Sequence, residues 1–248
     1  MGGQINTNST LGSSNFDGST QSTAKANATA GFSIVTFTGT GANATVGHGL
    51  GVAPQVLILK NRDEGQPWWV YHSSIGAGGQ LRLNETDAEG SDGGVLWNST
   101  APTSTVFSVG NNTGANGSSD KLVAYCFSEL AGYSKFGSYT GNGSSDGTFV
   151  FTGFRPAWVM FKSSSSGGSS SYEWMILDNK RETFNSMYKR LKPNSSDSEN
   201  TNSGTTAYVD FLSNGFKIRG TGSLIGQSGV TYIYLAFAES PFKYSRAR

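Results

Sequence analysis

The sequence contains one cysteine, Cys126, and two histidines, His48 and His72. A single thiol cannot form a disulfide within the chain. Because Cys126 lies in the apolar string LVAYCFSE, we interpret it as a small core residue. Two histidines without a cysteine pair exclude a zinc site of the usual spacing. His48, between two glycines, is predicted to be a loop residue, and His72 to end a strand.

Charged side chains are also scarce: they make up 14 % of the 248 residues and sum to a net charge of +1. This balance lacks the basic field that binding to nucleic acid or to an acidic membrane usually needs. No stretch approaches the roughly 18 apolar residues of a membrane span. The first 20 residues hold no apolar run of the kind found in secretion signals. We therefore expect no nucleic-acid partner, no membrane insertion, and assembly in the cytoplasm.

Glycine and aromatic residues, in contrast, are abundant, with 34 Gly, 15 Phe, 10 Tyr and 5 Trp. Short runs of aromatic and β-branched residues alternate with clusters of Gly, Ser and Asn. This pattern is typical of β-sandwiches and barrels. The number of aromatic residues argues against a disordered chain.

Several strings of the sequence occur twice. GVAPQVLILK (51–60) and GFRPAWVMFK (153–162) each have a glycine, a proline three residues later, an apolar run and a lysine, 102 positions apart (153 − 51). FTGTG (37–41) and YTGNG (139–143) keep this offset. VAYCFSE (123–129) matches IYLAFAE (233–239) at an offset of 110 (239 − 129). The kept order and the narrow range of offsets indicate a tandem duplication of a domain-sized unit.

These patterns predict an all-β chain of two tandem antiparallel β-sandwich (jelly-roll-like) domains behind a polar N-terminal arm. We place the arm at 1–30, the first sandwich at 31–134 and the second at 135–248. Alone, the arm would be a linker; if ordered, it must lie along another subunit or along the first sandwich. One helical turn is predicted within 181–192 from the spacing of its apolar residues. The predicted strands are 32–38, 55–61, 67–72, 79–83, 94–97, 104–109 and 121–129 in the first repeat, and 135–139, 147–152, 157–162, 172–177, 206–212, 215–219 and 230–238 in the second.

The repeated Gly-x-x-Pro string has a mechanical explanation. Glycine permits a bend at positive φ, and proline, which fixes φ and donates no hydrogen bond, precedes the strand. No Gly-x-Ser-x-Gly elbow follows a strand. Acidic pairs such as Asp178 and Glu182 are common in turns, and their spacing does not establish the separation that glycoside hydrolysis needs. We predict that the protein is not an enzyme and assign no catalytic residues.

Two weaker matches lie within the repeats. Setting Trp69 on Trp174 aligns WWVYH with EWMIL, and LNETDAEGSDGG (83–94) aligns with PNSSDSENTNSG (193–204), which repeats the pattern Asn-x-x-Asp-x-Glu. Its carboxylates would offer oxygen ligands to Ca²⁺. The alternative, which we favour, is that Asn and Asp close Asx turns in surface loops. We expect no cofactor, with Ca²⁺ as the alternative; the candidate ligands are Asp87, Glu89, Asp197 and Glu199.

Exposed tryptophans could stack on a sugar ring. Trp68 aligns with Glu173 and has no tryptophan counterpart, so we expect its ring to be exposed. Trp97 is the second candidate for a glycan platform. Trp69, Trp158 and Trp174 lie in strand patterns and are predicted to pack in the core.

Three long strings carry a family resemblance. GFSIVTFTGTGANATVGHGLGVAPQVLILKNRD, VAYCFSELAGYSKFGSYTGNGSSDGTFVFTGFRPAWVMFK, and the pair DFLSNGF and TYIYLAFAESPFKYSRAR together span about 31–248. They resemble a domain repeated in tail-fibre-like virion structural proteins of tailed bacteriophages, many of them marine. The resemblance implies a non-enzymatic, β-rich virion component, and it implies no catalytic or ligand-binding residues.

We therefore expect a phage virion structural protein, a tail fibre or receptor-binding component that assembles as a homo-oligomer, with a trimer favoured. A capsid decoration (head fibre or cement) protein is the alternative, and a carbohydrate-active depolymerase is a further one. The expected location is the virion, at the tail or capsid surface, after assembly in the bacterial cytoplasm. Expected partners are other copies of the chain, virion proteins that contact 1–30, and a host surface glycan or protein.

Overall fold

The computed structural model of the chain describes residues 12–201 and 207–240. The chain divides into two compact units. The first contains Met1–Leu83 and Gly90–Glu129; the second contains Asn84–Glu89 and Leu130–Arg248. Both are built of antiparallel strands, so the predicted all-β sandwich architecture is confirmed. Within the described ranges, no helix has the length and apolarity needed to cross a bilayer.

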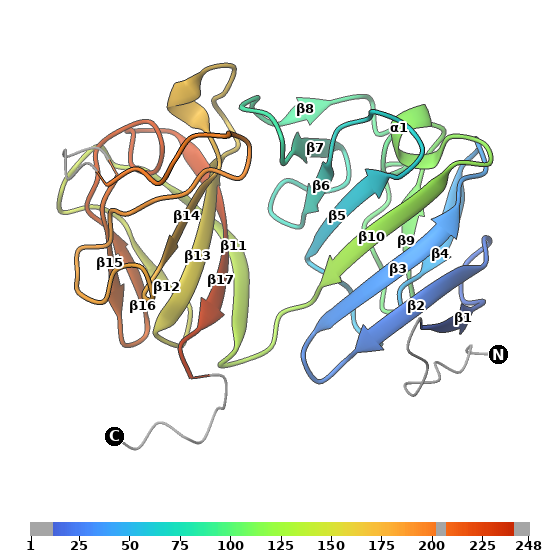
Figure 1. The fold of residues 1–248 in the computed structure, drawn as a ribbon, viewed down its shortest axis with the longest axis horizontal. Helices are drawn as coiled ribbons and strands as arrows, with labels where there is room; N and C mark the ends of the chain where they lie inside the picture. The colour runs from blue at the N-terminus through green and yellow to red at the C-terminus, as the bar shows by residue number, and fades with distance from the viewer. Residues whose placement is uncertain (1–11, 202–206, 241–248) are drawn as a thin grey trace. The chain divides into compact units, whose positions relative to one another are not determined.

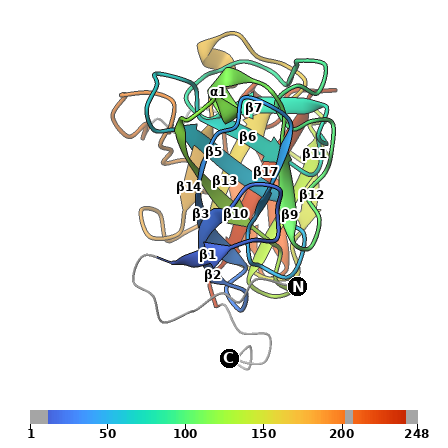
Figure 2. The same cartoon turned by 90° about the vertical axis from the view of Figure 1, so that its right-hand side faces the viewer.

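The first unit has one large and one small sheet (Figures 1 and 2). The large sheet has the order β1-β2-β3-β10-β5-β6-β7-β8, and the small one pairs β4 with β9. A single helical turn, α1 (Thr113–Asn116), precedes β10. The strands are β1 (Ser13–Asn15), β2 (Ser22–Asn27), β3 (Phe32–Thr38), β4 (Ala44–Gly47), β5 (Val56–Asn61), β6 (Trp69–His72), β7 (Gly79–Arg82), β8 (Gly90–Ser91), β9 (Val106–Val109) and β10 (Lys121–Phe127).

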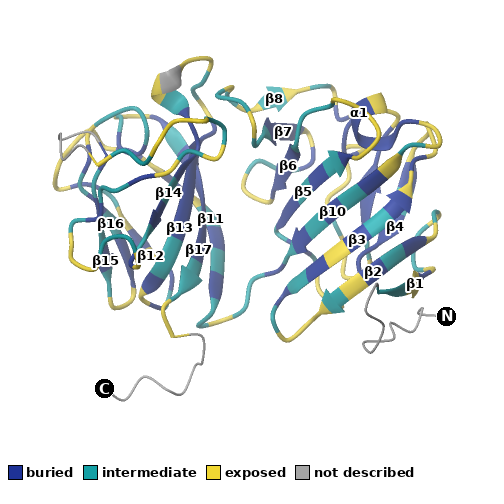
Figure 3. Cartoon of the chain, viewed as in Figure 1, coloured by how far each residue is buried: buried dark blue, intermediate teal, exposed yellow. Residues whose placement is uncertain are grey.

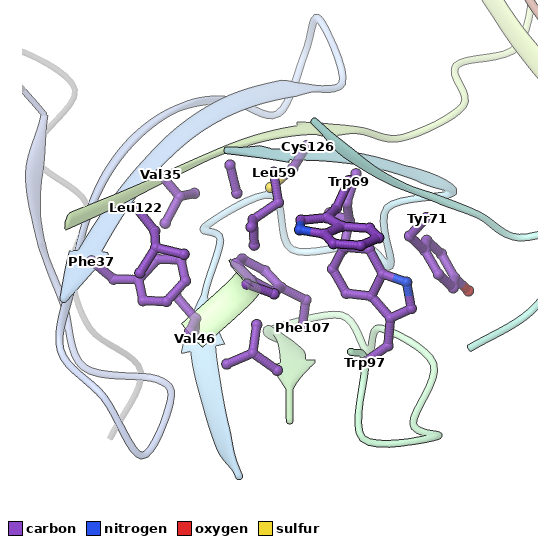
Figure 4. Close-up of a cluster of buried hydrophobic side chains, with 14 of the residues drawn as sticks. Val35, Phe37, Val46, Leu59, Trp69, Tyr71, Trp97, Phe107, Leu122 and Cys126 are labelled. Atoms are coloured by element: carbon purple, nitrogen blue, oxygen red, sulfur yellow. The ribbon is translucent and has the colours of Figure 1, made fainter. Parts of the chain in front are cut away.

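The core of the first unit lies between its two sheets. Side chains alternate along β3, where Val35 and Phe37 are buried and their neighbours are not, as Figure 3 shows. Figure 4 shows Phe107 of the small sheet facing Leu59 of the large one. The rings of Phe37 and Phe107 meet edge to face with centroids 6.0 Å apart. Each such fully buried side chain contributes roughly 1.5–3 kcal/mol to the free energy of unfolding.

The second unit repeats this plan. Its larger sheet has the order β11-β17-β13-β14, which matches β3-β10-β5-β6 of the first unit strand for strand. Its smaller sheet has the order β12-β16-β15. The elements are β11 (Ser134–Thr140), β12 (Phe149–Phe151), β13 (Pro156–Ser163), the 3-10 helix η1 (Ser170–Tyr172), β14 (Met175–Asp178), β15 (Val209–Leu212), β16 (Gly215–Ile218) and β17 (Thr231–Ala238).

The likeness of the two units extends to single glycines in the loops that follow β3 and β11. Gly41 and Gly143, which are 102 positions apart (143 − 41), both have φ = 70°. A Cβ on Gly41 would lie 3.1 Å from the Cβ of Ser118, and one on Gly143 would lie 3.1 Å from the Cβ of Ser228. The same loop therefore meets the same part of the chain in both units, as a tandem duplication predicts.

The N-terminal arm lies along the first unit, one of the two positions expected for it if ordered, and it is not a linker over residues 13–27. Residues 13–27 of the predicted linker 1–30 form β1 and β2, which extend the large sheet, and residues 1–11 lie outside the described ranges. Thr20 also bridges Val46 of β4 in parallel. Main-chain hydrogen bonds to a sheet edge need no apolar side chains, and for that reason the polar composition concealed these strands.

Two other elements were predicted wrongly. Residues 94–97 form a turn, because the Asp92 carboxylate accepts hydrogen bonds from the main-chain N–H groups of Gly94 and Leu96. The segment 181–192 is irregular and pairs in part with β14 and β15. Phe184, one of the residues of the supposed helical face, is 83 % exposed.

Substitution of the first glycine in the two repeated strings tests their mechanical role. Gly51 and Gly153 have φ of 76° and 82°, where an L side chain costs roughly 1–2 kcal/mol. We predict that Gly51→Ala and Gly153→Ala each lower the free energy of unfolding by about 1 kcal/mol in chemical denaturation. Gly65→Ala is the control, because a Cβ there meets nothing within 4 Å and φ is not positive. Equal stabilities for all three variants would contradict this explanation.

Candidate functional site

The two candidate glycan-stacking tryptophans have different environments. Trp68 precedes β6, is half-buried, and stacks on Tyr125 of β10 with ring centroids 6.4 Å apart. Trp97 is only 2 % exposed and packs edge to face against Tyr71 in the core (Figure 4). The prediction for Trp97 is therefore wrong, since a ring enclosed by core side chains cannot stack on a sugar. Trp68 stays a candidate because its ring is partly exposed.

Trp68 does have a tryptophan counterpart in the second unit. Leu59 pairs with Trp69, and Phe161 pairs with Met175 in the matching strands. This register matches Trp68 to Trp174.

The four candidate metal ligands do not form a cation site. Asp197 pairs with Lys192 at 2.9 Å, and Glu199 pairs with Arg181 at 2.9 Å. Across residues 12–201 and 207–240, no three His, Cys, Asp or Glu side chains gather where they could hold a metal ion. Asp197 and Glu199 line an open polar groove of about 400 Å³ together with Lys192.

The two copies of the Asn-x-x-Asp-x-Glu pattern do not occupy equivalent places. The first copy, Asn84–Glu89, which includes Asp87, is part of the second unit. Its Glu89 N–H donates to the carbonyl of Ser164 at 2.7 Å. The second copy lies in a loop of the same unit. The aligned carboxylates therefore do not mark a repeated binding site.

The segment Asn84–Glu89 is held by a buried lysine, Lys162, which ends the second of the two repeated strings. Lys162 is fully buried on β13, and its Nζ donates to the carbonyls of Thr86 at 3.2 Å and Ser163 at 2.8 Å. Burial lowers the pKa of Lys162 to about 8, and the charge of Asp87 opposes this shift. Lys60, the matching lysine of the first repeat, also donates to two main-chain carbonyls, those of Glu64 and Gln66. The repeated lysine thus binds main-chain carbonyl oxygens in both units, but it is buried only at Lys162, whereas Lys60 is half-buried.

His48 is buried and neutral, and its environment is structural. Burial lowers its pKa, against the effects of a hydrogen bond to Thr103 and of Asp17. Its Nδ1 accepts from the N–H of Leu50 at 3.1 Å, which leaves Nε2 to donate to the carbonyl of Thr103 at 3.1 Å. His48 is therefore a core residue at the end of β4, and the prediction of a plain loop residue was incomplete.

The second unit has a threonine where the first has His48. Val46 pairs with Phe107, and Val150 pairs with Phe216 in the matching strands, so His48 corresponds to Thr152. The Thr152 hydroxyl accepts a hydrogen bond from the N–H of Phe154, two residues later, at 3.4 Å. The His48 ring accepts one from Leu50 N–H, also two residues later. The two side chains close the same turn with different chemistry, and this favours a structural role for the imidazole.

The other buried titratable groups also serve the core. Cys126 is fully buried, as predicted, and burial raises its pKa to about 12, so it carries no reactive thiolate. Tyr139 and Tyr232 stack with ring centroids 5.2 Å apart. Their hydroxyls donate to the carbonyls of Ile225 and Ser223 at 2.8 Å. Burial raises the pKa of Tyr232 to about 12.

A shallow groove in the first unit combines hydroxyl groups with two cations. It has a volume of about 530 Å³ and lies over β2, β3 and the start of β10. Arg62 and Lys121 contribute its positive charge, and no carboxylate lines it. The remaining lining residues are Thr20, Gln21, Ser22, Thr23, Thr36, Phe37 and Thr38. Sequence patterns did not reveal this groove, because its residues come from separate strands.

Comparison with known families identifies one match. The family described as "Domain of unknown function (DUF7483)" matches residues 6–241. The chain belongs to this family. The match runs through both units and includes much of the N-terminal arm. A search of curated proteins and a search of solved structures found no match.

The pKa of Lys162 yields a test of its burial. Because it lies near 8 in the folded chain against an ordinary value of 10.5, the unfolded chain binds more protons between these pH values. The cost of burying the charge is full below pH 8 and is relieved as pH rises toward 10.5. We predict that, between pH 8 and 10.5, the free energy of unfolding of the wild type rises by up to about 3 kcal/mol relative to that of Lys162→Met.

The measurement is chemical denaturation of both proteins at a series of pH values from 7 to 10.5. Lys60→Met, which removes the matching lysine of the first repeat and keeps Lys162, is the control. Its free energy of unfolding should depend on pH as that of the wild type does. Parallel curves for wild type and Lys162→Met would contradict the assignment.

Proposed function

We propose that the chain is a non-enzymatic structural protein of a phage virion, a tail-fibre or receptor-binding component that assembles with copies of itself. The observation that carries the proposal is that the two units share their architecture and not a set of reactive groups. The strand order of the larger sheets recurs, as do the positive-φ glycines Gly41 and Gly143. In contrast, His48 of the first unit is replaced by Thr152 in the second. The resemblance of 31–248 to tail-fibre-like virion proteins supports the same role.

The groove at Arg62 and Lys121 is the site we propose for contact with the host. Two cations and several hydroxyls suit an acidic, hydroxyl-rich ligand, such as a uronic or sialic acid residue of a surface polysaccharide. Trp68, half-buried on Tyr125, offers part of an indole face on the same unit. An attachment protein needs loops and grooves on a rigid scaffold, and the buried sheets supply that scaffold.

Capsid decoration is the second candidate. A chain of two sandwiches with a Ser- and Thr-rich arm that already adds strands to a sheet edge resembles a module that docks on a larger surface. A depolymerase is a third candidate, which release of reducing ends from host polysaccharide would reveal.

Labelling of virions tests the proposal. Antibodies against the purified chain, coupled to gold, should bind purified phage particles that carry it. Label at the tail would support a fibre or receptor-binding role, and label over the head would support decoration. Particles that lack the chain are the control. Absence of the chain from purified virions, by labelling and by mass spectrometry, would contradict a structural role in the virion.

A further inference from the structure

Strand β12 in the second unit lies in a sequence that reads the same in both directions. Residues 147–153 are Gly-Thr-Phe-Val-Phe-Thr-Gly, with Val150 at the centre. β12 is an end strand of the sheet β12-β16-β15 (Figure 1). The segment has no charged residue and no proline, the features that usually protect a sheet edge from pairing with another chain.

The two phenylalanines of β12 point outward. Val150 is 7 % exposed and belongs to the core, whereas Phe149 and Phe151 are 44 % and 64 % exposed. Each of the other large exposed apolar residues in the described ranges stands without a second one on its own strand. Two such rings on one edge strand form an apolar patch of the kind that marks an interaction surface.

The main-chain groups of the two phenylalanines face away from the sheet. Ile218 N–H donates to the Thr148 carbonyl, and Thr152 N–H donates to the Asn214 carbonyl. In an antiparallel pair the hydrogen-bonded positions alternate. Residues 148, 150 and 152 are therefore bonded to β16, and the N–H and C=O groups of Phe149 and Phe151 point to the outer edge.

In the first unit, the matching edge is already occupied. Val46 corresponds to Val150, so Thr45 and Gly47 correspond to Phe149 and Phe151. The Thr45 carbonyl accepts from Thr20 N–H at 3.1 Å, and the Gly47 carbonyl accepts from the Ser22 hydroxyl at 2.8 Å. The N-terminal arm of the same chain thus supplies the partner that this edge takes.

The edge of the second unit requires a different occupant. A Cβ on Gly47 would lie 2.1 Å from Oδ1 of Asn15, so the polar arm covers this position only because it is glycine. Phe151 in the matching place would exclude an arm of that kind. The occupant of β12 must offer both free main-chain groups and apolar side chains, and a second β12 offers both.

We propose that β12 is the surface through which two copies of this chain associate, paired antiparallel about a two-fold axis at Val150. Because the sequence is palindromic, this register sets Phe149 opposite Phe151 of the second copy, and Thr148 opposite Thr152. The outward N–H and C=O groups of both phenylalanines then form a hydrogen-bonded ladder. The four rings lie on one face as two cross-strand aromatic pairs.

The size and symmetry of this contact define what should be observed. A self-complementary patch closes as a dimer, in contrast to the trimer expected from the sequence. Three residues and two rings per copy bury far less than the roughly 800 Å² per partner of a standard interface. We therefore expect a weak dimer that dissociates on dilution. This inference does not depend on the virion role.

Sedimentation velocity of the full-length chain, over a concentration series from about 1 to 500 µM, measures the association. Phe149→Thr/Phe151→Thr, which takes Thr45 of the first repeat as its model, should weaken dimerisation at least tenfold. Phe184→Ser is the matched control, because Phe184 is an exposed phenylalanine elsewhere in the second unit and its loss should leave the dimer unchanged. Far-UV circular dichroism checks that each variant keeps its sheets.

Cross-linking tests the register without relying on the threonine variants. Because the native Cys126 is buried, a cysteine placed at 149 or 151 is the reactive one. A mixture of Phe149→Cys and Phe151→Cys should form a disulfide-linked heterodimer faster than either variant forms a homodimer. A monomeric wild type throughout the series, a dimer unaffected by the threonine substitutions, or equal cross-linking in all combinations would overturn the proposal.

Discussion

Each unit is organised around a central strand, the last strand of its repeat, which is paired along both edges in a sheet that packs against a second sheet. β10 lies between β3 and β5, and β17 lies between β11 and β13. The first strand of each repeat pairs with this last strand, and the chain then turns into the second sheet at Gly41 or Gly143, whose φ of 70° permits the turn. The two units therefore share their corner glycines and strand order while their surfaces differ.

The sequence predicted the central strands well because they combine a strong apolar pattern with a repeat. β3 was predicted at its observed bounds, and β5, β10, β13 and β17 to within two residues at each end. The predicted alignment of WWVYH (68–72) with EWMIL (173–177) was wrong by one residue. Leu59 pairs with Trp69 and Phe161 pairs with Met175, so Trp69 corresponds to Met175 and not to Trp174. The sequence does not reveal which residues pair across strands, so the identity of two tryptophans decided the alignment instead of the true register.

The sequence could not predict features that arise from contacts between distant segments. Trp97 was misassigned because its burial depends on the Asp92 turn, and the polar strands β1 and β2 are stabilised by a sheet edge and not by their own composition. The carboxylates of the Asn-x-x-Asp-x-Glu pattern pair with lysine and arginine in one copy, and the other copy joins the second unit. The two units share the strand order of their larger sheets and differ in their edges and grooves, so each unit has its own surface.

Native-state hydrogen exchange tests the central claim most directly, that the chain contains two copies of one sandwich closed by its last strand. In each unit the amides of the central strand should be among the slowest to exchange, those of β10 in the first and of β17 in the second, because these strands are bonded along both edges and lie in the core sheet. Slowest exchange in unrelated elements of the two units, or a central strand that exchanges at the rate of the loops, would contradict the account.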